Sequence, residues 1–253
     1  MLSPDLRRKL SKFNLERNET ENLEYHITPL ATTLESVIPG RVHVHEYGEL
    51  YIVERSASDF GILPQEELIS RLTVLTTLGY TPEEALFLDI ETCGIASRPL
   101  FLIGIMRVCD GELKIEQFFA RNYAEEKSIL AHAADTIAKH KMLATFNGKA
   151  YDIPYIRDRM LYHKLEAKFD VEHLDLLHHA RRKWRRILPN CQLKTLEENI
   201  CGRRRFGDIP SEIIPELYHA FVRTGNAEPI EIIFRHNALD LIAMAELLPH
   251  IGL

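Results

Sequence analysis

The chain has 253 residues, of which 45% are hydrophobic and 27% are charged, values typical of a globular protein of one or two domains. Its net charge is −6, because 37 acidic residues outnumber 31 basic ones, which excludes a globally basic nucleic-acid coat but not local basic patches. No apolar run approaches the roughly 18 residues that a membrane-spanning helix needs, so we expect no membrane partner. We also expect no signal peptide. The four cysteines are far apart and predict reduced thiols in a cytoplasmic protein: Cys93, Cys109, Cys191 and Cys201.

The first part of the chain predicts a small α+β extension. Residues 1–25 are rich in charge and indicate a short helix or a loose arm. From 41 to 55, branched or aromatic residues alternate with polar ones around Tyr47 and Gly48, which predicts a β-hairpin with its turn at that pair. The segment 64–78 carries apolar residues at helical spacing and is followed by a glycine, so we expect an amphipathic helix there.

A Thr-Pro-Glu-Glu sequence at 81–84 marks the boundary that we expect between two domains. We therefore predict a hairpin-plus-helix extension over 1–82 and a second domain over 83–253. In the second domain, strands in hairpin order precede alternating helices and strands, which predicts an α/β class with a mixed sheet covered by helices. The expected elements are strands at 85–92, 99–108 and 112–120, a helix at 125–140, a strand at 142–146, a helix from 153, a strand ending at 175, and mostly helices thereafter.

The strand at 85–92 carries two carboxylates, Asp89 and Glu91. Side chains alternate along a strand, so these two share one face with Phe87. Both faces are otherwise apolar, as in a central buried strand, where two neighbouring acids repel each other and lose hydration. A divalent cation resolves both problems, and oxygen ligands suit Mg²⁺ or Mn²⁺. The alternative is an edge strand whose acids are solvated.

A third carboxylate, Asp152, follows an expected strand and an Asn-Gly turn. Carboxylates placed at strand ends beside helix N-termini often belong to sites that bind polar ligands. The simpler interpretation is that Asp152 only caps the helix that begins near Ile153 and Pro154.

The segment 229–248 is apolar around most of its circumference and predicts a largely buried helix. Within it, His236 and Asp240 are four residues apart and share one helix face. One interpretation is that the two simply bond each other as a satisfied core pair. Together, however, the acids in the order DxE, D and HxxxD form a constellation far more specific than its parts.

The segments FLDIETCGI, LATFNGKAYDIPYI and RHNALDLIA resemble the three motifs of the DEDD (DnaQ-like) 3′→5′ exonucleases, which have an RNase H-like fold. The strings LDLLHHARRKW, LKTLEENICGRRR and DIP, with the HN-x-x-D helix, are similar to the YprB-type exonucleases, RNase H-like proteins linked to bacterial mitomycin repair. The resemblance covers roughly residues 85–250. It implies a mixed five-stranded sheet flanked by helices, the metal ligands Asp89, Glu91, Asp152 and Asp240, and His236 as general base.

The spacing of His236 departs from the family pattern. The histidine branch of these exonucleases places the base five residues before the last Asp, whereas the tyrosine branch uses four. Here the spacing is four and the residue is histidine, so the branch stays open. The residue types suit two Mg²⁺ or Mn²⁺ ions about 4 Å apart that clamp the scissile phosphate, with His236 taking a proton from the attacking water.

Basic residues are concentrated between 181 and 205, in a protein that is acidic overall. Such residues neutralise phosphates, and Tyr151 or Trp184 could stack on an unpaired base. The alternatives are a solvated basic helix face and a Trp184 that belongs to the core. We expect nucleic-acid contacts from Asn147, Lys149, Tyr151, Arg181, Arg182, Lys194, Arg203, Arg204 and Arg205.

We therefore expect a metal-dependent 3′→5′ exonuclease that acts on single-stranded 3′ ends, on DNA in preference to RNA, in DNA repair. A helicase is a candidate partner. The alternatives are an RNA-processing exonuclease or an endonuclease on the same fold, and a catalytically silent nucleic-acid-binding module. Retention of four buried acids favours an enzyme, because such charges cost stability without a cation.

Overall fold

The computed structural model of this chain describes residues 33–95, 97–167 and 169–253. The helix or arm that we expected within 1–25 lies outside these residues. In the described part of the chain, none of the helices is long and apolar enough to span a membrane.

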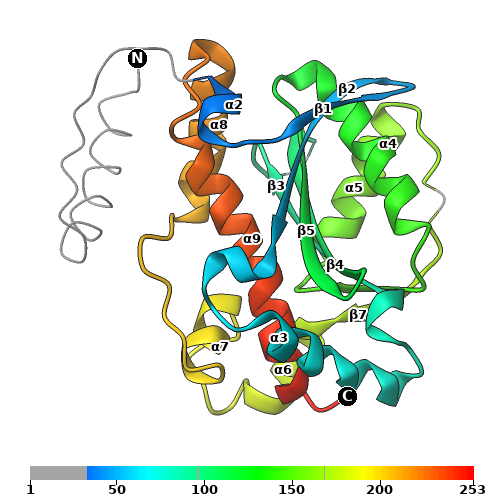
Figure 1. Cartoon of the computed structure of the whole chain (residues 1–253), viewed down its shortest axis with the longest axis vertical. Helices are drawn as coiled ribbons and strands as arrows, with labels where there is room; N and C mark the ends of the chain where they lie inside the picture. Colours follow the sequence, from blue (N-terminus) through cyan, green and yellow to red (C-terminus); the bar gives the residue numbers. More distant parts are fainter. Residues whose placement is uncertain (1–32, 96, 168) are drawn as a thin grey trace.

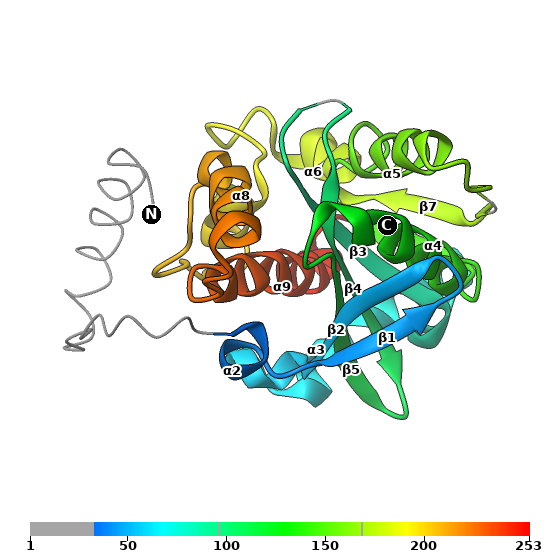
Figure 2. The same ribbon diagram turned by 90° about the horizontal axis from the view of Figure 1, so that it is seen from above.

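The described elements form one mixed sheet with helices on both faces (Figures 1 and 2). The strands run in the order β1-β2-β5-β4-β3-β6-β7. Strand β3 is antiparallel to β4 and parallel to β6, and β6 is parallel to β7. The strands are β1 (Arg41–His45), β2 (Gly48–Ser56), β3 (Ala85–Thr92), β4 (Leu100–Cys109), β5 (Glu112–Phe119), β6 (Met142–Thr145) and β7 (Glu172–Asp175).

The sheet has seven strands, which corrects the five-stranded sheet that the resemblance implied. The two additional strands are the predicted hairpin, because β2 pairs antiparallel with β5 from Tyr51 opposite Phe119 to Ser56 opposite Lys114. Without β2, the strand β5 would leave its N–H and C=O groups unpaired at an edge. The hairpin therefore extends the same sheet that carries β3.

Helices α4 and α5 cover one face of the sheet, and α9 and α3 cover the other, with α8 beside α9 (Figures 1 and 2). The helices are α2 (Leu34–Val37), α3 (Gln65–Leu72), α4 (Glu126–Ile137), α5 (Asp152–Tyr162), α6 (Leu176–Trp184), α7 (Leu193–Asn199), α8 (Ile214–Thr224) and α9 (Ile230–Leu247). The mixed sheet flanked by helices confirms the predicted α/β class.

The helix expected over 64–78 is α-helical only as far as Leu72 and continues as a 3₁₀ helix to Leu78. In the second part, the hydroxyl groups of Thr73, Thr76 and Thr77 each donate to the carbonyl three residues earlier. Such bonds compete with the α-helical pattern and favour the tighter turn.

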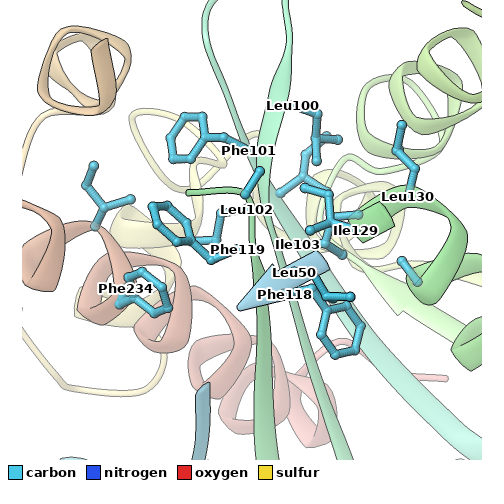
Figure 3. Close-up of a cluster of buried hydrophobic side chains, with 14 of the residues drawn as sticks. Leu50, Leu100, Phe101, Leu102, Ile103, Phe118, Phe119, Ile129, Leu130 and Phe234 are labelled. Carbon is cyan, nitrogen blue, oxygen red and sulfur yellow. The ribbon is translucent and has the colours of Figure 1, made fainter. Parts of the chain in front are cut away.

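Aromatic side chains fasten α9 to the central strands. Phe119 on β5 lies against Phe234 on α9, with ring centroids 5.1 Å apart (Figure 3). Phe101 on β4 stacks at 3.9 Å on Tyr218 of α8, which packs beside α9. This packing fixes α9 over β3 and β4, and α9 is the helix that carries the predicted His236 and Asp240.

Candidate active site

Strand β3 directs Asp89 and Glu91 toward α9. Phe87 packs in a hydrophobic cluster with Leu241 of α9, whereas Leu88 belongs to the cluster that includes the residues of α4 and α5. The alternation expected from the sequence therefore holds. Because β3 lies between β4 and β6, it is a central strand and not an edge. Glu91 is buried, with 8% of its surface exposed, and Asp89 is partly buried.

Asn237 ties α9 to Asp89. Its amide Nδ2 donates to Asp89 Oδ2 at 2.8 Å, and its Oδ1 accepts from Gln117 Nε2 on β5 at 2.8 Å. Gly104, which faces Asp89 across the β3–β4 ladder, makes room for the amide, since a Cβ there would lie 2.0 Å from Asn237 Oδ1. The amide therefore fixes the orientation of the Asp89 carboxylate from the helix side.

The turn between β6 and α5 brings Asp152 to the same place. Asn147 adopts a left-handed backbone with φ 69°, and its N–H donates to Asp175 Oδ1 at 2.8 Å. Asp175 also accepts from the backbone of Lys149 and Leu177, so its buried carboxylate organises the turn. Asp152 is the first residue of α5 and is 5% exposed. Its carboxylate lines the cleft described below, so Asp152 is not simply a surface helix cap.

On α9, His236 and Asp240 share one face, as the spacing predicts, with Nε2 and Oδ2 3.8 Å apart. The shorter contact of His236 is with another residue, because Nδ1 lies 2.5 Å from Asp208 Oδ1. Asp240 Oδ1 in turn lies 2.5 Å from Arg205 Nη1. His236 and Asp240 are therefore not an isolated core pair.

The five predicted catalytic residues line a single cleft of about 560 Å³. They come from three segments that are far apart in the sequence, namely β3, the start of α5 and α9. Two of the expected nucleic-acid contacts, Asn147 and Tyr151, also lie in its wall, and the Tyr151 hydroxyl is 3.2 Å from Thr92 Oγ1. The remaining wall is formed by Ile90, Thr92, Gly94, Ile95, Phe146, Ser211, Glu212, Ile214 and Pro215.

Burial and neighbouring negative charge raise the pKa values of three carboxylates in the cleft, those of Asp89, Glu91 and Asp152. Burial raises the pKa of Asp89 well above its ordinary value, and the charges of Asp240, Glu91 and Asp152 add to this effect. The pKa of Glu91 is raised well above its ordinary value by burial and then by Asp240 and Asp152. Burial raises the pKa of Asp152 to about 7, with backbone N–H groups opposing the shift. A site with these properties calls for a compensating positive charge.

The surroundings of His236 and Asp208 stabilise the charged form of each side chain. Burial lowers the pKa of His236, but the hydrogen bond to Asp208 and the charges of Asp240 and Asp208 outweigh burial, so the pKa is raised overall. Burial raises the pKa of Asp208, but His236, Lys194 and Arg205 outweigh it, so this pKa is lowered. Asp208 is therefore an ionised carboxylate beside a histidine.

The donor set of the cleft fits a hard divalent cation in ligand type and in charge. The four predicted carboxylates line it together with Glu212, and oxygen ligands of this kind are those that Mg²⁺ and Mn²⁺ prefer. Within residues 33–95, 97–167 and 169–253, no three His, Cys, Asp or Glu side chains stand in an arrangement that closes around an ion. One oxygen of Asp240 is held by Arg205 instead.

The predicted basic residues fall into an exposed and an internal group. Arg181 and Arg182 are exposed on α6, and Arg181 lines a second cavity of about 410 Å³ with Arg185, Asn190 and Cys191. Lys149 and Arg204 are also exposed. Lys194 is half-exposed and its Nζ lies 2.7 Å from Asp208 Oδ2. Trp184 is buried in the core, as its alternative interpretation held.

Arg203 and Arg205, two of the expected nucleic-acid contacts, pair with buried carboxylates inside the protein. Arg205 Nε is 2.6 Å from Glu197 Oε2, and its side chain is 3% exposed. Arg203 pairs with Glu197 and, at 2.5 Å, with Glu246 Oε2. The physical reason is that Glu197 and Glu246 are buried, and buried carboxylates require cationic partners.

Sequence reasoning missed Asp208, Asn237 and the internal role of Arg205. The signals were present, since Asp208 begins the DIP string and Asn237 follows His236 in the last motif. Their partners lie 28 and 148 positions away in the sequence, however, so no local pattern identifies the contacts.

Comparison with known proteins places this fold and site in a family. A model of the RNase H superfamily matches residues 86–251, which include all five predicted catalytic residues. The chain belongs to the RNase H superfamily. Members of this superfamily are nucleases, and they generally use divalent metal ions, so hydrolysis of nucleic acid is the broad class of activity that the family supports.

This RNase H superfamily member is 29% identical over 183 residues to the uncharacterized protein YprB of Bacillus subtilis (strain 168). The match covers 70% of this chain and 44% of YprB, so the chain spans less than half the length of that relative. The fold is similar to part of the family B DNA polymerase from the hyperthermophilic archaeon Pyrobaculum calidifontis. The TM-score is 0.54 at 14% identity, over 66% of this chain and 24% of the polymerase, and this likeness concerns the fold alone.

Proposed function

We propose that this protein is a metal-dependent 3′→5′ exonuclease of the DEDD type that hydrolyses phosphodiester bonds at single-stranded 3′ ends of DNA. The observation that carries the proposal is the convergence of Asp89, Glu91, Asp152, Asp240 and His236 on one cleft. Membership of a nuclease superfamily supports the broad activity. The direction of cleavage, the preference for DNA and a role in DNA repair come from the motif resemblance.

The four carboxylates would hold Mg²⁺ or Mn²⁺. When bound, such ions polarise the scissile phosphate and lower the pKa of water. Without a cation, the same carboxylates would repel a phosphate, because their negative charges lie close enough together for Asp240 and Asp152 to raise the pKa values of Asp89 and Glu91. The cleft residues therefore make activity strictly dependent on divalent metal.

His236 would act as the general base. When its ring is neutral, Nε2 can accept a proton from water as the water oxygen attacks phosphorus and the bond to the leaving 3′ oxygen breaks. Helix α9 keeps His236 buried except at the cleft, where Nε2 lies beside Asp240. Tyr151, which is exposed at the cleft wall, would stack on an unpaired base, and Asn147 beside it would orient the substrate.

The exposed cations Lys149, Arg181, Arg182 and Arg204 are those that we propose for the phosphate backbone, together with the half-exposed Lys194. Arg181 and Arg182 lie on α6, which directly follows β7 at the edge of the sheet beside β6. Asp152 follows β6, so these cations are carried by elements next to the cleft. A strand held there would be bound mainly through charge and would be released by salt.

The proposal is tested with the full chain and a single-stranded oligonucleotide labelled at the 5′ end or at the 3′ end, in Mg²⁺, in Mn²⁺ and in EDTA. A 3′→5′ exonuclease shortens the 5′-labelled strand in single-nucleotide steps and releases the 3′ label at once as a mononucleotide. Internal fragments from both strands would indicate an endonuclease instead. Binding without any cleavage would indicate a silent module.

The same reaction run on RNA of identical sequence separates the two sugars. Faster shortening of the DNA strand is the expected result. Faster shortening of RNA would contradict the preference for DNA and support an RNA-processing enzyme with the same catalytic groups.

A further inference from the structure

Four side chains, two of which line the cleft, form a closed ring of contacts. His236 Nδ1 is 2.5 Å from Asp208 Oδ1, and Asp208 Oδ2 is 3.4 Å from Arg205 Nη1. Arg205 Nη1 is 2.5 Å from Asp240 Oδ1, and Asp240 Oδ2 is 3.8 Å from His236 Nε2. The ring joins two residues of α9 to two residues of the loop that follows α7. Asp208 therefore contacts His236 and Arg205 contacts Asp240, although neither Asp208 nor Arg205 lines the cleft.

Asp208 is placed to orient other side chains and not to bind an ion. Its Oδ1 accepts from His236 and from the backbone N–H of Ile209 at 3.0 Å. Its Oδ2 contacts Arg205 and, at 2.7 Å, Lys194 Nζ. Both oxygens are thus occupied by protein donors, and Asp208 is not among the residues that line the cleft.

The contact with Asp208 decides which nitrogen of His236 carries hydrogen. An ionised carboxylate only accepts hydrogen bonds, so the nitrogen that faces it must carry the proton. That nitrogen is Nδ1, and the neutral ring then has its lone pair on Nε2. Nε2 is the nitrogen on the side of Asp240, whose carboxylate lies in the cleft wall.

We propose that Asp208 is a positioning residue, which holds His236 in the Nδ1–H tautomer with Nε2 directed to the cleft and, through Arg205, fixes one oxygen of Asp240. The inference rests on the proposed function, because only a base needs a free Nε2. Hydrogen bonds of this kind set the tautomer and ring orientation of functional histidines in general. Asp208 acts on the reaction only through its neighbours.

The first test reads the tautomer directly and does not depend on activity. The full chain is labelled with ¹⁵N-histidine, and the ring nitrogens of His236 are observed by NMR at an alkaline pH at which the ring is neutral. His236 is assigned by the signals that disappear in His236→Ala. The wild-type protein should show the Nδ1–H tautomer. Asp208→Ala should shift His236 toward Nε2–H, the tautomer that a free histidine ring favours.

Two further variants separate orientation from folding. Asp208→Asn keeps the shape of the side chain and an oxygen that accepts from Nδ1–H, so the Nδ1–H tautomer should remain. Lys194→Ala removes another partner of Asp208 without touching His236 and should also leave the tautomer unchanged. The inference is overturned if Asp208→Ala keeps the wild-type tautomer, or if Asp208→Asn loses it as fully as Asp208→Ala.

The second test uses cleavage of the labelled strand. Asp208→Ala should lower kcat by roughly 10- to 100-fold with little change in KM, and Asp208→Asn should restore most of the rate. An unchanged kcat in Asp208→Ala would contradict the positioning role. If the wild-type protein cleaves nothing, the proposed function fails, whereas the NMR result still decides whether Asp208 sets the tautomer.

Discussion

At the scale of single residues, the chemistry of His236 depends on two carboxylates that both raise the pKa of its ring. Asp208 contacts Nδ1 and Asp240 lies near Nε2, and together they raise the pKa of the ring although burial alone would lower it. A general base acts in its neutral form. The rate should therefore fall as the pH falls through the pKa of His236.

The first prediction concerns replacement of this histidine. His236→Ala should lose turnover by a factor on the order of 10²–10⁴, the typical contribution of a general base, while it still binds Mn²⁺ and a 3′ end. The acidic limb of its pH–rate profile should flatten, because the titrating group is gone. His236→Tyr should recover part of the rate, since tyrosine occupies this spacing in one branch of the exonucleases that the motifs resemble. Equal wild-type and His236→Ala rates between about pH 6 and 9 would reduce His236 to a core residue.

The residues at the site differ in how far the sequence reveals them. Alternation along a strand was enough to place Asp89 and Glu91 together, and helical spacing was enough for His236 and Asp240. Asp208 lies in a loop without any periodic pattern, and its role depends on a partner 28 positions away. Asn237 was quoted in a motif without a role, because its contact with Asp89 joins two elements across the fold. Sequence periodicity therefore shows which side chains share a face of a strand or helix, whereas the roles of Asp208 and Asn237 follow only from contacts between distant elements.

At the scale of elements, the loop after α7 is held to α9 by ion pairs that charge composition alone cannot reveal. Arg204 and Arg205 are adjacent and look equivalent in the sequence. Arg204 is exposed, with a side chain 74% accessible, whereas Arg205 is 3% exposed and contacts Glu197 and Asp240. The difference arises because Glu197 is buried on α7 and needs a cation.

The second prediction uses this matched pair. Arg205→Ala should destabilise the protein by about 3 to 5 kcal/mol, since it leaves buried carboxylates without their partner. Arg204→Ala should leave the free energy of unfolding nearly unchanged, because its nearest acid, Glu198, is 4.0 Å away in solvent. Urea unfolding followed by circular dichroism measures both. Equal stability of the two variants would show that the internal ion pairs of Arg205 contribute little.

The predicted hairpin shows that the sequence locates strands but not the strands with which they pair. Alternation around the predicted turn identified β1 and β2, which the structure confirms, although the turn itself is formed by Glu46 and Tyr47 and Gly48 already pairs with His45. The sequence contained no signal that β2 pairs with β5, because pairing partners are chosen by the packing of the whole sheet. The strand count was therefore wrong although each strand was located.

At the scale of the whole molecule, two half-buried histidines, one on α4 and one on β7, make a contribution to stability that acid removes. Burial lowers the pKa of His132 on α4 to about 4, and positive charge on His43 and His45 adds to this effect. Burial also lowers the pKa of His173 on β7 to about 4, with Lys149 adding to it. Both values lie below the ordinary 6.5 of an unfolded chain. Between about pH 4 and 6.5, these two side chains therefore bind fewer protons in the folded protein than in the unfolded chain.

The third prediction follows from the sign of this linkage. The stability that these two histidines contribute is fully present above the unfolded pKa and is lost as the pH falls from 6.5 toward 4. In the metal-free protein the raised pKa values of Asp89, Glu91 and Asp152 act in the opposite direction, so the effect of the histidines is measured as a difference between variants. As the pH falls from about pH 7 to pH 4.5, the melting temperature of the double variant His132→Gln and His173→Gln should rise relative to that of the wild type, whereas His178→Gln, at an exposed position, should follow the wild type. A constant difference in melting temperature between the double variant and the wild type over this range would contradict the prediction.

The fourth prediction concerns where nucleic acid lies on the molecule. Arg181 and Arg182 are exposed on α6, which follows β7 at one edge of the sheet, and Arg41 is on β1 at the other edge. Arg181→Ala with Arg182→Ala should weaken binding of single-stranded DNA and flatten its salt dependence by roughly one unit of slope per lost phosphate contact. Arg41→Ala removes a charge from the far edge and should leave the slope unchanged. Equal slopes for all three proteins would place the strand elsewhere.

The central claim is that carboxylates from three distant segments form one metal-binding centre. Titration of Mn²⁺ into the purified full chain, followed by calorimetry, tests it most directly with Asp89→Asn and with Asp158→Asn, an exposed aspartate on α5, as the matched control. We predict that Asp89→Asn weakens Mn²⁺ binding by at least about tenfold and that Asp158→Asn binds as the wild type does. Binding of Mn²⁺ by Asp89→Asn with wild-type affinity would contradict the claim.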